Sequence, residues 1–223
     1  MTYNFSFDYF FDAFPTVLLG LGATLEVTFL SFILAFVFAI LLSAVSMVKN
    51  RAVQLFYKFW LSLFRGTPLL VQLFLFIYGI FPLIPGLSSL SLLWKAIICL
   101  ALAFSAYMAE TIRGAILSVD KGQMEACRTV GMTTVQAYIH VVLPQAFRLA
   151  IPSLMNNFIE CFKGSAQASM VGVMDMMLRA KMLTSRTLRY IEGYLCVMIL
   201  YWVLNMIFTA FQKLLERKLS AKY

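Results

Sequence analysis

Long apolar runs separated by short polar stretches form the main pattern of this chain. Five runs are of the kind that crosses a membrane: residues 17–48, 69–83, 92–117, from after Pro152 to about 162, and 194–215. A helix needs about 20 predominantly apolar residues to span the hydrocarbon core of a bilayer. The pattern therefore predicts an all-α integral membrane protein with about five transmembrane helices.

Three parts of this pattern leave more than one interpretation open. The first run is longer than a straight crossing requires, so it is either tilted or begins with a turn at the interface. Residues 53–64 are amphipathic, and they either extend the second helix or lie along the membrane surface. Within 169–188, the apolar part 170–174 is too short to cross, which predicts a short extracytoplasmic or re-entrant helix there.

Composition supports the membrane class and narrows the chemistry. Hydrophobic residues make up 62% of the 223 residues and charged residues 13%, so lipid must cover part of the surface. The net charge of +8 fits cytoplasmic loops of a membrane protein better than a nucleic-acid surface. The four cysteines are far apart and His140 is the single histidine, which argues against a metal site. We expect no cofactor on this chain and no nucleic-acid partner.

The cations orient the predicted helices. Three groups fall on one side of a five-helix arrangement: Lys49, Arg51, Lys58 and Arg65; Arg113, Lys121, Arg128 and Arg148; and Lys213, Arg217, Lys218 and Lys222. The positive-inside rule makes that side cytoplasmic and places the N-terminus outside. Four cations between 179 and 189 then lie outside, against the rule. A sixth crossing near Met170 is the alternative, but the basic C-terminal end favours five.

A polar loop at about 118–144 stands out between the third and fourth runs. Residues 123–129 read as a short helix, Gly131 as a sharp corner, and 133–142 as a second short helix stopped by Pro144. From composition alone, a solvated helical loop explains these features better than a docking surface does.

The spacing within the loop resembles a known pattern. Glu125, Ala126, Gly131, Leu143 and Pro144 stand at the spacing of the loop motif in permease subunits of bacterial ABC importers. Cys127 replaces a second alanine of that motif and Val141 replaces isoleucine. The resemblance implies the type I importer fold and a cytoplasmic coupling loop, including Arg128, that docks on an ATPase subunit.

Further motifs are similar to those of polar amino-acid importers. They are residues 65–72, which read RGTPLLVQ, together with 107–115 and 143–148, and the resemblance spans about 17–217. It implies a bacterial inner or plasma membrane location, a second permease copy, and two ATPase subunits that hold ATP and magnesium. It also implies an extracytoplasmic binding protein. We expect an extracytoplasmic arm at 1–16, a transmembrane domain at 17–217 and a cytoplasmic tail at 218–223.

One segment departs from that family. Residues 163–167 read KGSAQ, where the family commonly has a sequence like KDTSL. The lysine is present, but the acidic residue and the hydroxyl pair are not. The resemblance therefore carries over no substrate contact to residues 164–167.

Polar residues within the apolar runs are the candidates for a pathway, because unpaired charges in lipid are costly. The candidate pathway residues are Asn156, Asn157, Glu160, Lys163 and Gln72. Hydrogen bonding between helices is an equally good interpretation of the two asparagines. Glu110 and Arg113 are three residues apart on the third helix, which favours a structural or gating pair.

The function expected from these residues is that of a permease subunit which imports polar amino acids or derivatives such as cystine. The chain has no GxxxxGK[ST] motif, so the resemblance places ATP hydrolysis on partner subunits. A secondary transporter or a channel without ATPase partners is the alternative. The lack of an inverted repeat in so short a chain counts against a secondary transporter. Nothing in the sequence identifies which amino acid is carried.

Overall fold

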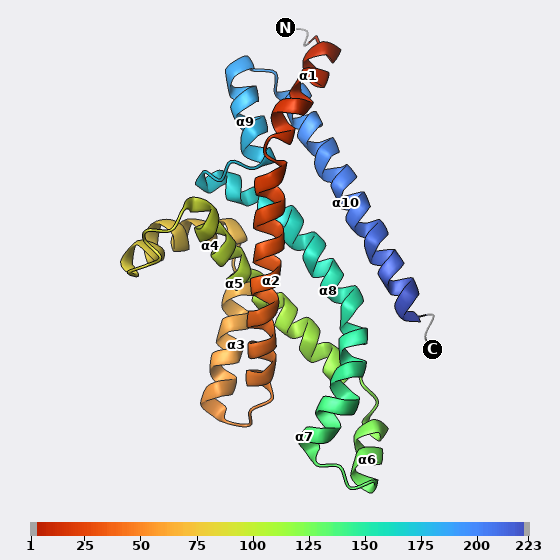
Figure 1. Cartoon of the computed structure of the whole chain (residues 1–223). Coiled ribbons are helices and arrows are strands. Elements are labelled where there is room, and N and C mark those ends of the chain that lie inside the picture. The colour runs from red at the N-terminus through yellow and green to blue at the C-terminus, as the bar shows by residue number, and fades with distance from the viewer. Residues whose placement is uncertain (1–3, 221–223) are drawn as a thin grey trace.

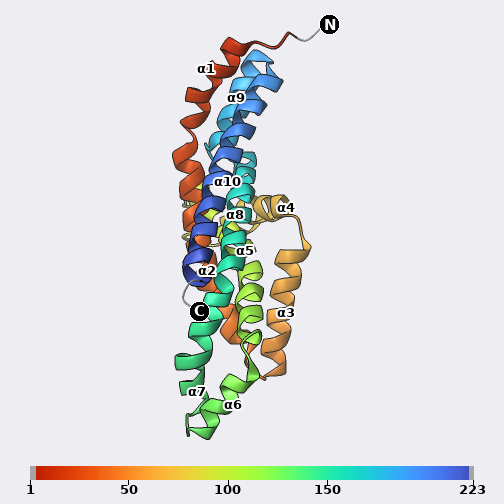
Figure 2. The ribbon, with the colours of Figure 1, turned by 90° about the vertical axis from the view of Figure 1, so that its right-hand side faces the viewer.

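The chain forms an elongated bundle of helices (Figures 1 and 2). The computed structural model describes residues 4–220, and side chains up to 218. In order, the helical segments are α1 Phe7–Leu18, α2 Leu21–Ser46, α3 Arg51–Gly66, α4 Leu69–Phe74, η1 Leu75–Ile80, η2 Phe81–Leu83, α5 Leu92–Leu117, α6 Lys121–Thr129, α7 Thr134–Ala137, η3 Tyr138–Val142, α8 Leu143–Ser165, η4 Ala166–Val171, α9 Met176–Thr187 and α10 Tyr190–Ser220. Those residues contain no β-strand, and the predicted all-α membrane fold is confirmed.

Helices of membrane-spanning length make up most of this bundle. In the described part of the chain α2, α5 and α10 are long and apolar enough to cross, and the bent pair α3–α4 is a fourth candidate. α8 has 23 residues, about 34 Å at 1.5 Å per residue, and packs against α2, α5 and α10. Its charged and amide side chains make α8 less apolar than α2, α5 and α10. α8 is thus the fifth membrane-length helix.

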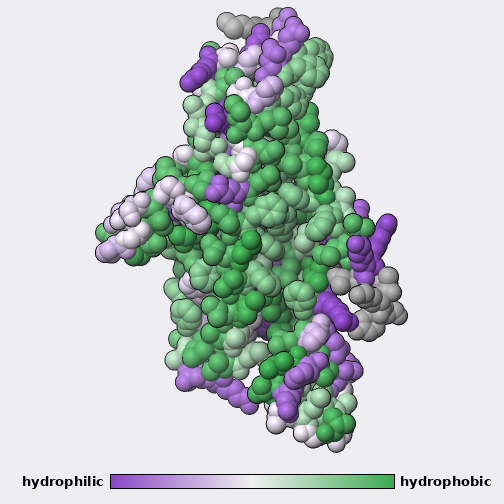
Figure 3. Space-filling view, viewed as in Figure 1, coloured by the Kyte–Doolittle hydropathy of each residue, from purple (hydrophilic) through white to green (hydrophobic). Residues whose placement is uncertain are grey.

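Helix α2 buries mainly small side chains and exposes large apolar ones, unlike a typical helix of a soluble protein. α2 buries small and weakly polar residues: Thr24, Thr28, Ser31, Ala35, Ala39 and Ser43. Large apolar residues on its other faces, such as Phe29 and Ile33, are exposed, as expected where lipid is the solvent. Small residues let helix backbones approach closely, and Ser31 Oγ donates to the carbonyl of Ile97 on α5 at 3.2 Å. Hydrophobic surface covers the middle of the molecule in Figure 3.

The first apolar run, 17–48, is not one helix. α1 ends at Leu18 and α2 begins at Leu21, so the helix is interrupted around Gly20. A Cβ atom added at Gly20 would lie 2.4 Å from the backbone of Asp175, which precedes α9. The break therefore sits where only a glycine lets the two segments meet.

α3 and α4 do not form one straight helix, although both stretches are helical. The axis of α3 and that of the segment Leu69–Leu83, which begins with α4, are bent by 107°, and Thr67 between them has extended backbone. Pro68 cannot continue the hydrogen bonding of α3. The Gln72 side-chain amide instead donates to the carbonyl of Phe64 at 3.0 Å and of Thr67 at 3.1 Å.

Two predicted helix boundaries around the fourth run are wrong. Pro144 does not stop the second loop helix, because the turn at η3 widens and Leu143 N–H donates to the carbonyl of Tyr138, five residues back. Pro144 then lies in the first turn of α8, where a missing N–H is tolerated. α8 also begins well before Pro152 and continues through it. The loop helix and the fourth run are therefore one continuous rod.

The predicted short helix beyond the fourth run exists, but not at 170–174. Those residues end the 3₁₀ turn η4 and form a loop with Gly172 at φ +95°. α9 begins only at Met176, because the Asp175 side chain caps it by accepting from Leu178 N–H at 2.8 Å. The α9 end of the molecule also holds α1, and it lies opposite α6 and α7 in both ribbon views.

Both predicted terminal segments extend beyond the described residues. Residues 1–3 of the predicted arm and 221–223 of the predicted tail, with Lys222, lie outside them. In the described part, α1 packs on α9 and α10 through Ala13 and Val17. Buried Glu192 of α10 accepts from the backbone N–H of Ser6 at 3.0 Å and from Arg189 at 2.9 Å. The described part of the N-terminal segment thus packs against the junction of α9 and α10.

Candidate functional site

The loop at 118–144 forms an arm of two short helices at one end of the molecule (Figure 1). Asp120 caps α6 by accepting from Gly122 N–H at 2.7 Å. The chain then turns at Gly131, whose φ of +80° is a conformation that glycine adopts without strain. Thr133 and Gln136 form a reciprocal capping box that starts α7. The predicted helix–corner–helix arrangement is confirmed.

The motif residues of α6 divide between an outer and an inner face. Glu125, Ala126 and Arg128 are exposed, while Cys127 is buried. At the tip of the arm, Val130 and Val135 are 74% and 66% exposed. Exposed apolar residues beside charges, on a segment beyond the membrane helices, are typical of a docking face. The small Ala126 leaves the backbone of this face accessible.

Leu143 and Pro144 lie where the arm joins α8, rather than on its outer tip. α7, η3 and α8 follow one another without a break from Thr134 to Ser165. Movement of the arm therefore reaches the membrane helices through one rigid element.

A cavity of about 350 Å³ lies where the α3–α4 bend, α5 and α8 meet. Four of the five candidate pathway residues line it: Gln72, Asn157, Glu160 and Lys163. Aromatic side chains from Phe64, Phe104 and Tyr107 complete much of its wall. Residues that are distant in sequence thus form one partly polar chamber within the bundle.

Asn156 does not share this chamber. Its Oδ1 accepts from Gln212 of α10 at 3.1 Å, whereas Asn157 Nδ2 donates to Thr111 Oγ1 of α5 at 2.9 Å. Each asparagine therefore makes a hydrogen bond between helices, and only Asn157 also faces the cavity. Consecutive residues on a helix point about 100° apart, which separates the two.

Glu160 and Lys163 form an ion pair in the lining of the cavity. Lys163 Nζ lies 2.6 Å from Glu160 Oε1, and their side chains are 51% and 63% exposed. Breaking an ion pair this exposed costs little free energy, so each side chain can instead pair with the opposite charge of a zwitterionic ligand. Gln72, by contrast, is 5% exposed and uses its amide nitrogen to stabilise the α3–α4 bend.

The segment that departs from the family pattern, 163–167, also borders the cavity. A Cβ atom at Gly164 would lie 3.2 Å from Phe104 and 3.3 Å from Leu69, so the glycine lets α8 approach α5 and α4 closely. Gln167 lines the cavity as well. Sequence reasoning identified this segment as unusual but did not include either residue among the pathway candidates.

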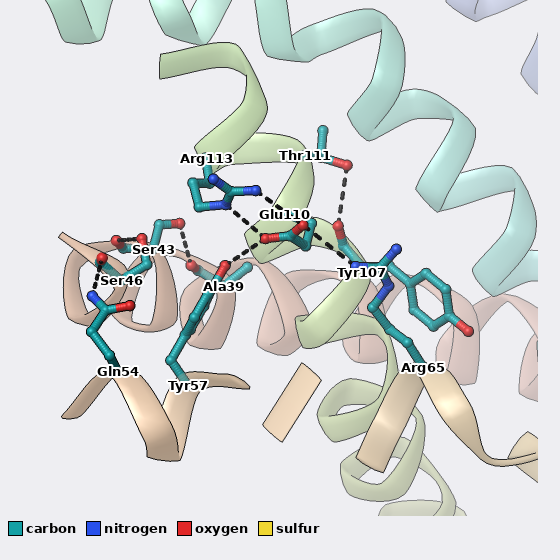
Figure 4. A network of polar contacts seen from close by, with 10 residues as sticks. All are labelled: Ala39, Ser43, Ser46, Gln54, Tyr57, Arg65, Tyr107, Glu110, Thr111 and Arg113. Carbon is teal, nitrogen blue, oxygen red and sulfur yellow. Dashed lines mark hydrogen bonds and ion pairs between the residues drawn. The ribbon is translucent and has the colours of Figure 1, made fainter. Parts of the chain in front are cut away.

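Glu110 and Arg113 form the expected pair, within a larger network (Figure 4). Arg113 Nε donates to Glu110 Oε1 at 2.7 Å, and Tyr57 Oη donates to the same oxygen at 2.8 Å. The Arg65 guanidinium lies 3.5 Å from Glu110 Oε2 and 5.7 Å from the centre of the Tyr107 ring. One carboxylate thus ties the middle of α3, at Tyr57, and its C-terminal end, at Arg65, to α5.

Comparison with known proteins gives consistent matches along the chain. A family described as "Binding-protein-dependent transport system inner membrane component" matches residues 31–221. The probable amino-acid permease protein YxeN of Bacillus subtilis (strain 168) is 43% identical over 97% of this chain and 96% of its own length. The probable amino-acid ABC transporter permease protein PatM of Vibrio harveyi is 41% identical over 99% of both chains.

A solved structure matches the fold equally well. A crystal structure of an amino acid ABC transporter with histidines superimposes with a TM-score of 0.89 at 33% identity. The match covers 97% of this chain and all of the other.

Proposed function

The chain belongs to the family of binding-protein-dependent transport system inner membrane components, and we propose that it carries polar amino acids, or derivatives such as cystine, into the cytoplasm. It is a multi-pass inner-membrane permease of an ABC importer and is not itself the ATPase. ATPase subunits and a substrate-binding subunit complete such a transporter.

The observation that carries the amino-acid proposal is similarity over nearly the whole chain to two amino-acid permeases. The cavity adds chemical support. An α-amino acid presents a carboxylate and an ammonium, and Lys163 and Glu160 offer one charge of each sign. Asn157 supplies an amide beside them, and the aromatic wall suits the rest of the ligand.

We propose that a second permease copy, identical or closely related, covers the cavity. Glu160 and Lys163 are both more than half exposed in a single chain. Exposing this charge pair to lipid at the depth of α8 would be unfavourable. A second permease removes that exposure and encloses the pathway between the two chains.

Coupling in this proposal runs through the arm. Two ATPase subunits, which bind ATP and magnesium, dock on the exposed faces of the two arms. Glu125, Ala126, Arg128 and Gly131 shape that face, and the buried Cys127 supports it from the inner side of α6. Leu143 and Pro144 join it to α8. ATP-driven closure of the ATPases then moves α8, which also carries Glu160.

Replacing Glu160 with Gln tests the pathway. Loss of this carboxylate removes the partner for the substrate ammonium, so the KM for uptake should rise about two- to fivefold. Basal ATPase activity of the reconstituted complex should change less than the KM. Uptake assays in proteoliposomes with several amino acids measure both quantities.

Glu26→Gln is the matched control, because Glu26 is an exposed carboxylate on α2 outside the cavity. Its uptake kinetics should equal those of the natural protein. Unchanged kinetics in Glu160→Gln for every amino acid tested would remove Glu160 from the pathway.

A further inference from the structure

A second, larger cavity lies between the arm and the membrane helices. Its volume is about 530 Å³, within the range of small-molecule sites. Ser46 and Met47 at the end of α2 line it, as do Ile116 and Leu117 at the end of α5, and α6 and η3 close the other side. It thus lies between the arm and the ends of α2 and α5.

The cavity lies at the level where the apolar helices end. α2 ends at Ser46 and α5 at Leu117, and both are residues of its wall. The cations Lys49 and Arg51 follow directly after α2. Figure 1 shows α6 and α7 beyond these helix ends. This is the depth of phospholipid headgroups on the cytoplasmic side.

Apolar and charged groups both face this space. Met47 is 46% exposed and Leu117 is 68% exposed, at the side where acyl chains begin. Lys121 and Arg128 supply positive charge on the α6 side, and Asp120 and Glu125 supply negative charge. No ion pair within residues 4–220 engages these four groups. Arg113 also lines the cavity, but Glu110 already neutralises it.

We propose that this cavity binds the headgroup of a zwitterionic phospholipid that carries a primary ammonium, such as phosphatidylethanolamine. The balance of charges decides between lipid classes. A phosphodiester pairs with Lys121 and the ammonium pairs with Asp120, whereas Glu125 and Arg128 stand at the edge that faces the ATPase subunit. A purely anionic headgroup would leave the two carboxylates facing a like charge. The acyl chains lie along Met47 and Leu117.

Native mass spectrometry of the purified transporter complex, titrated with lipids of identical acyl chains, tests the proposal. Phosphatidylethanolamine should bind about fivefold more tightly than phosphatidylcholine, whose trimethylated nitrogen cannot donate hydrogen bonds. Phosphatidylglycerol should also bind more weakly. Equal binding of the three lipids would overturn the proposal. So would displacement of the lipid by an equal concentration of soluble glycerophosphoethanolamine, because the acyl chains along Met47 and Leu117 would then contribute nothing to binding.

Two variants locate the binding to this cavity. Lys121→Gln should weaken phosphatidylethanolamine binding about fivefold, whereas Lys49→Gln, which removes an exposed cation outside the cavity, should not. Asp120→Asn keeps the cap of α6 and should abolish the preference for phosphatidylethanolamine over phosphatidylcholine. Equal effects of Lys121→Gln and Lys49→Gln, or a preference that survives in Asp120→Asn, would contradict the assignment. The mass spectrum measures lipid binding directly, so the lipid site is tested independently of the proposal on amino-acid uptake.

Discussion

At the residue scale, Gly131 sets the corner of the arm. Its φ of +80° costs a residue with a side chain about 1–2 kcal/mol, and a β-branched residue more. Gly131→Val should therefore reduce the population of correctly shaped arms about five- to thirtyfold. The expected result is ATP hydrolysis with little uptake, measured as the ratio of the two rates in proteoliposomes.

Substitution by asparagine at the same position is the control. Asn adopts the left-handed conformation more readily than other residues with side chains, so Gly131→Asn should keep most of the coupling. In the described part of the chain, no atom other than those of Gly131 and its two neighbours lies within 4 Å of a Cβ placed there, so any difference reflects backbone shape rather than a clash. Normal coupling in Gly131→Val would show that the corner is not needed.

Asp175 is a second residue whose environment predicts behaviour. It is 1% exposed, and burial raises its pKa to about 7 despite the backbone N–H of Leu178. The folded state therefore binds a proton more tightly than the unfolded chain. The free energy of unfolding falls as the pH rises from about 4 to about 7, and the cost persists above pH 7.

Asp175→Asn keeps the cap of α9 but removes the buried charge. Its melting temperature in detergent should exceed that of the natural protein at pH 8, and by a smaller margin near pH 5, where only part of the cost has developed. An equal shift at both pH values for Asp175→Asn would contradict the assigned pKa.

At the scale of elements, glycines and prolines decide how helices meet. α9 and α10 approach so closely that a Cβ at Gly193 would lie 2.3 Å from Thr184 Cγ2. Overpacking of this kind costs about 1–3 kcal/mol. Gly193→Ala should therefore lower the melting temperature, as followed by thermal unfolding in detergent.

The atom that would clash, Thr184 Cγ2, can instead be removed from α9. Thr184→Ser deletes Cγ2 and keeps the hydroxyl that donates to the carbonyl of Lys181 at 3.0 Å. The double variant should recover most of the stability lost in Gly193→Ala, so that the two effects are not additive. Purely additive effects would show that the two helices can separate slightly without cost.

Helix boundaries show which sequence signals are reliable. Residues 92–117 were predicted as one run and form α5 with the same bounds, because Ser91 caps a continuous apolar segment. The boundaries at Pro144 and Pro152 were wrong because a widened turn at η3 and packing on neighbouring helices let α8 continue past both prolines. Tertiary contacts of this kind leave no local signal in the sequence.

At the scale of the whole molecule, the proposed pathway requires two chains. The transporter purified with its ATPase subunits, and with no other permease expressed, should contain two copies of this 25.3 kDa chain. Two ATPase subunits should accompany them. Native mass spectrometry measures the composition directly. A complex with one copy of this chain would contradict the pairing.

The sequence by itself determined the membrane class, the long helices, the arm and the residues that carry the family's motifs. These features follow from local rules: hydrophobic run length, caps, and glycine or proline at defined positions. Tertiary structure alone decided that Gln72, Asn157, Glu160 and Lys163 share one cavity while Asn156 points elsewhere. The reason is geometric, because the rotation of α8 and the 107° bend between α3 and α4 arise from packing between helices.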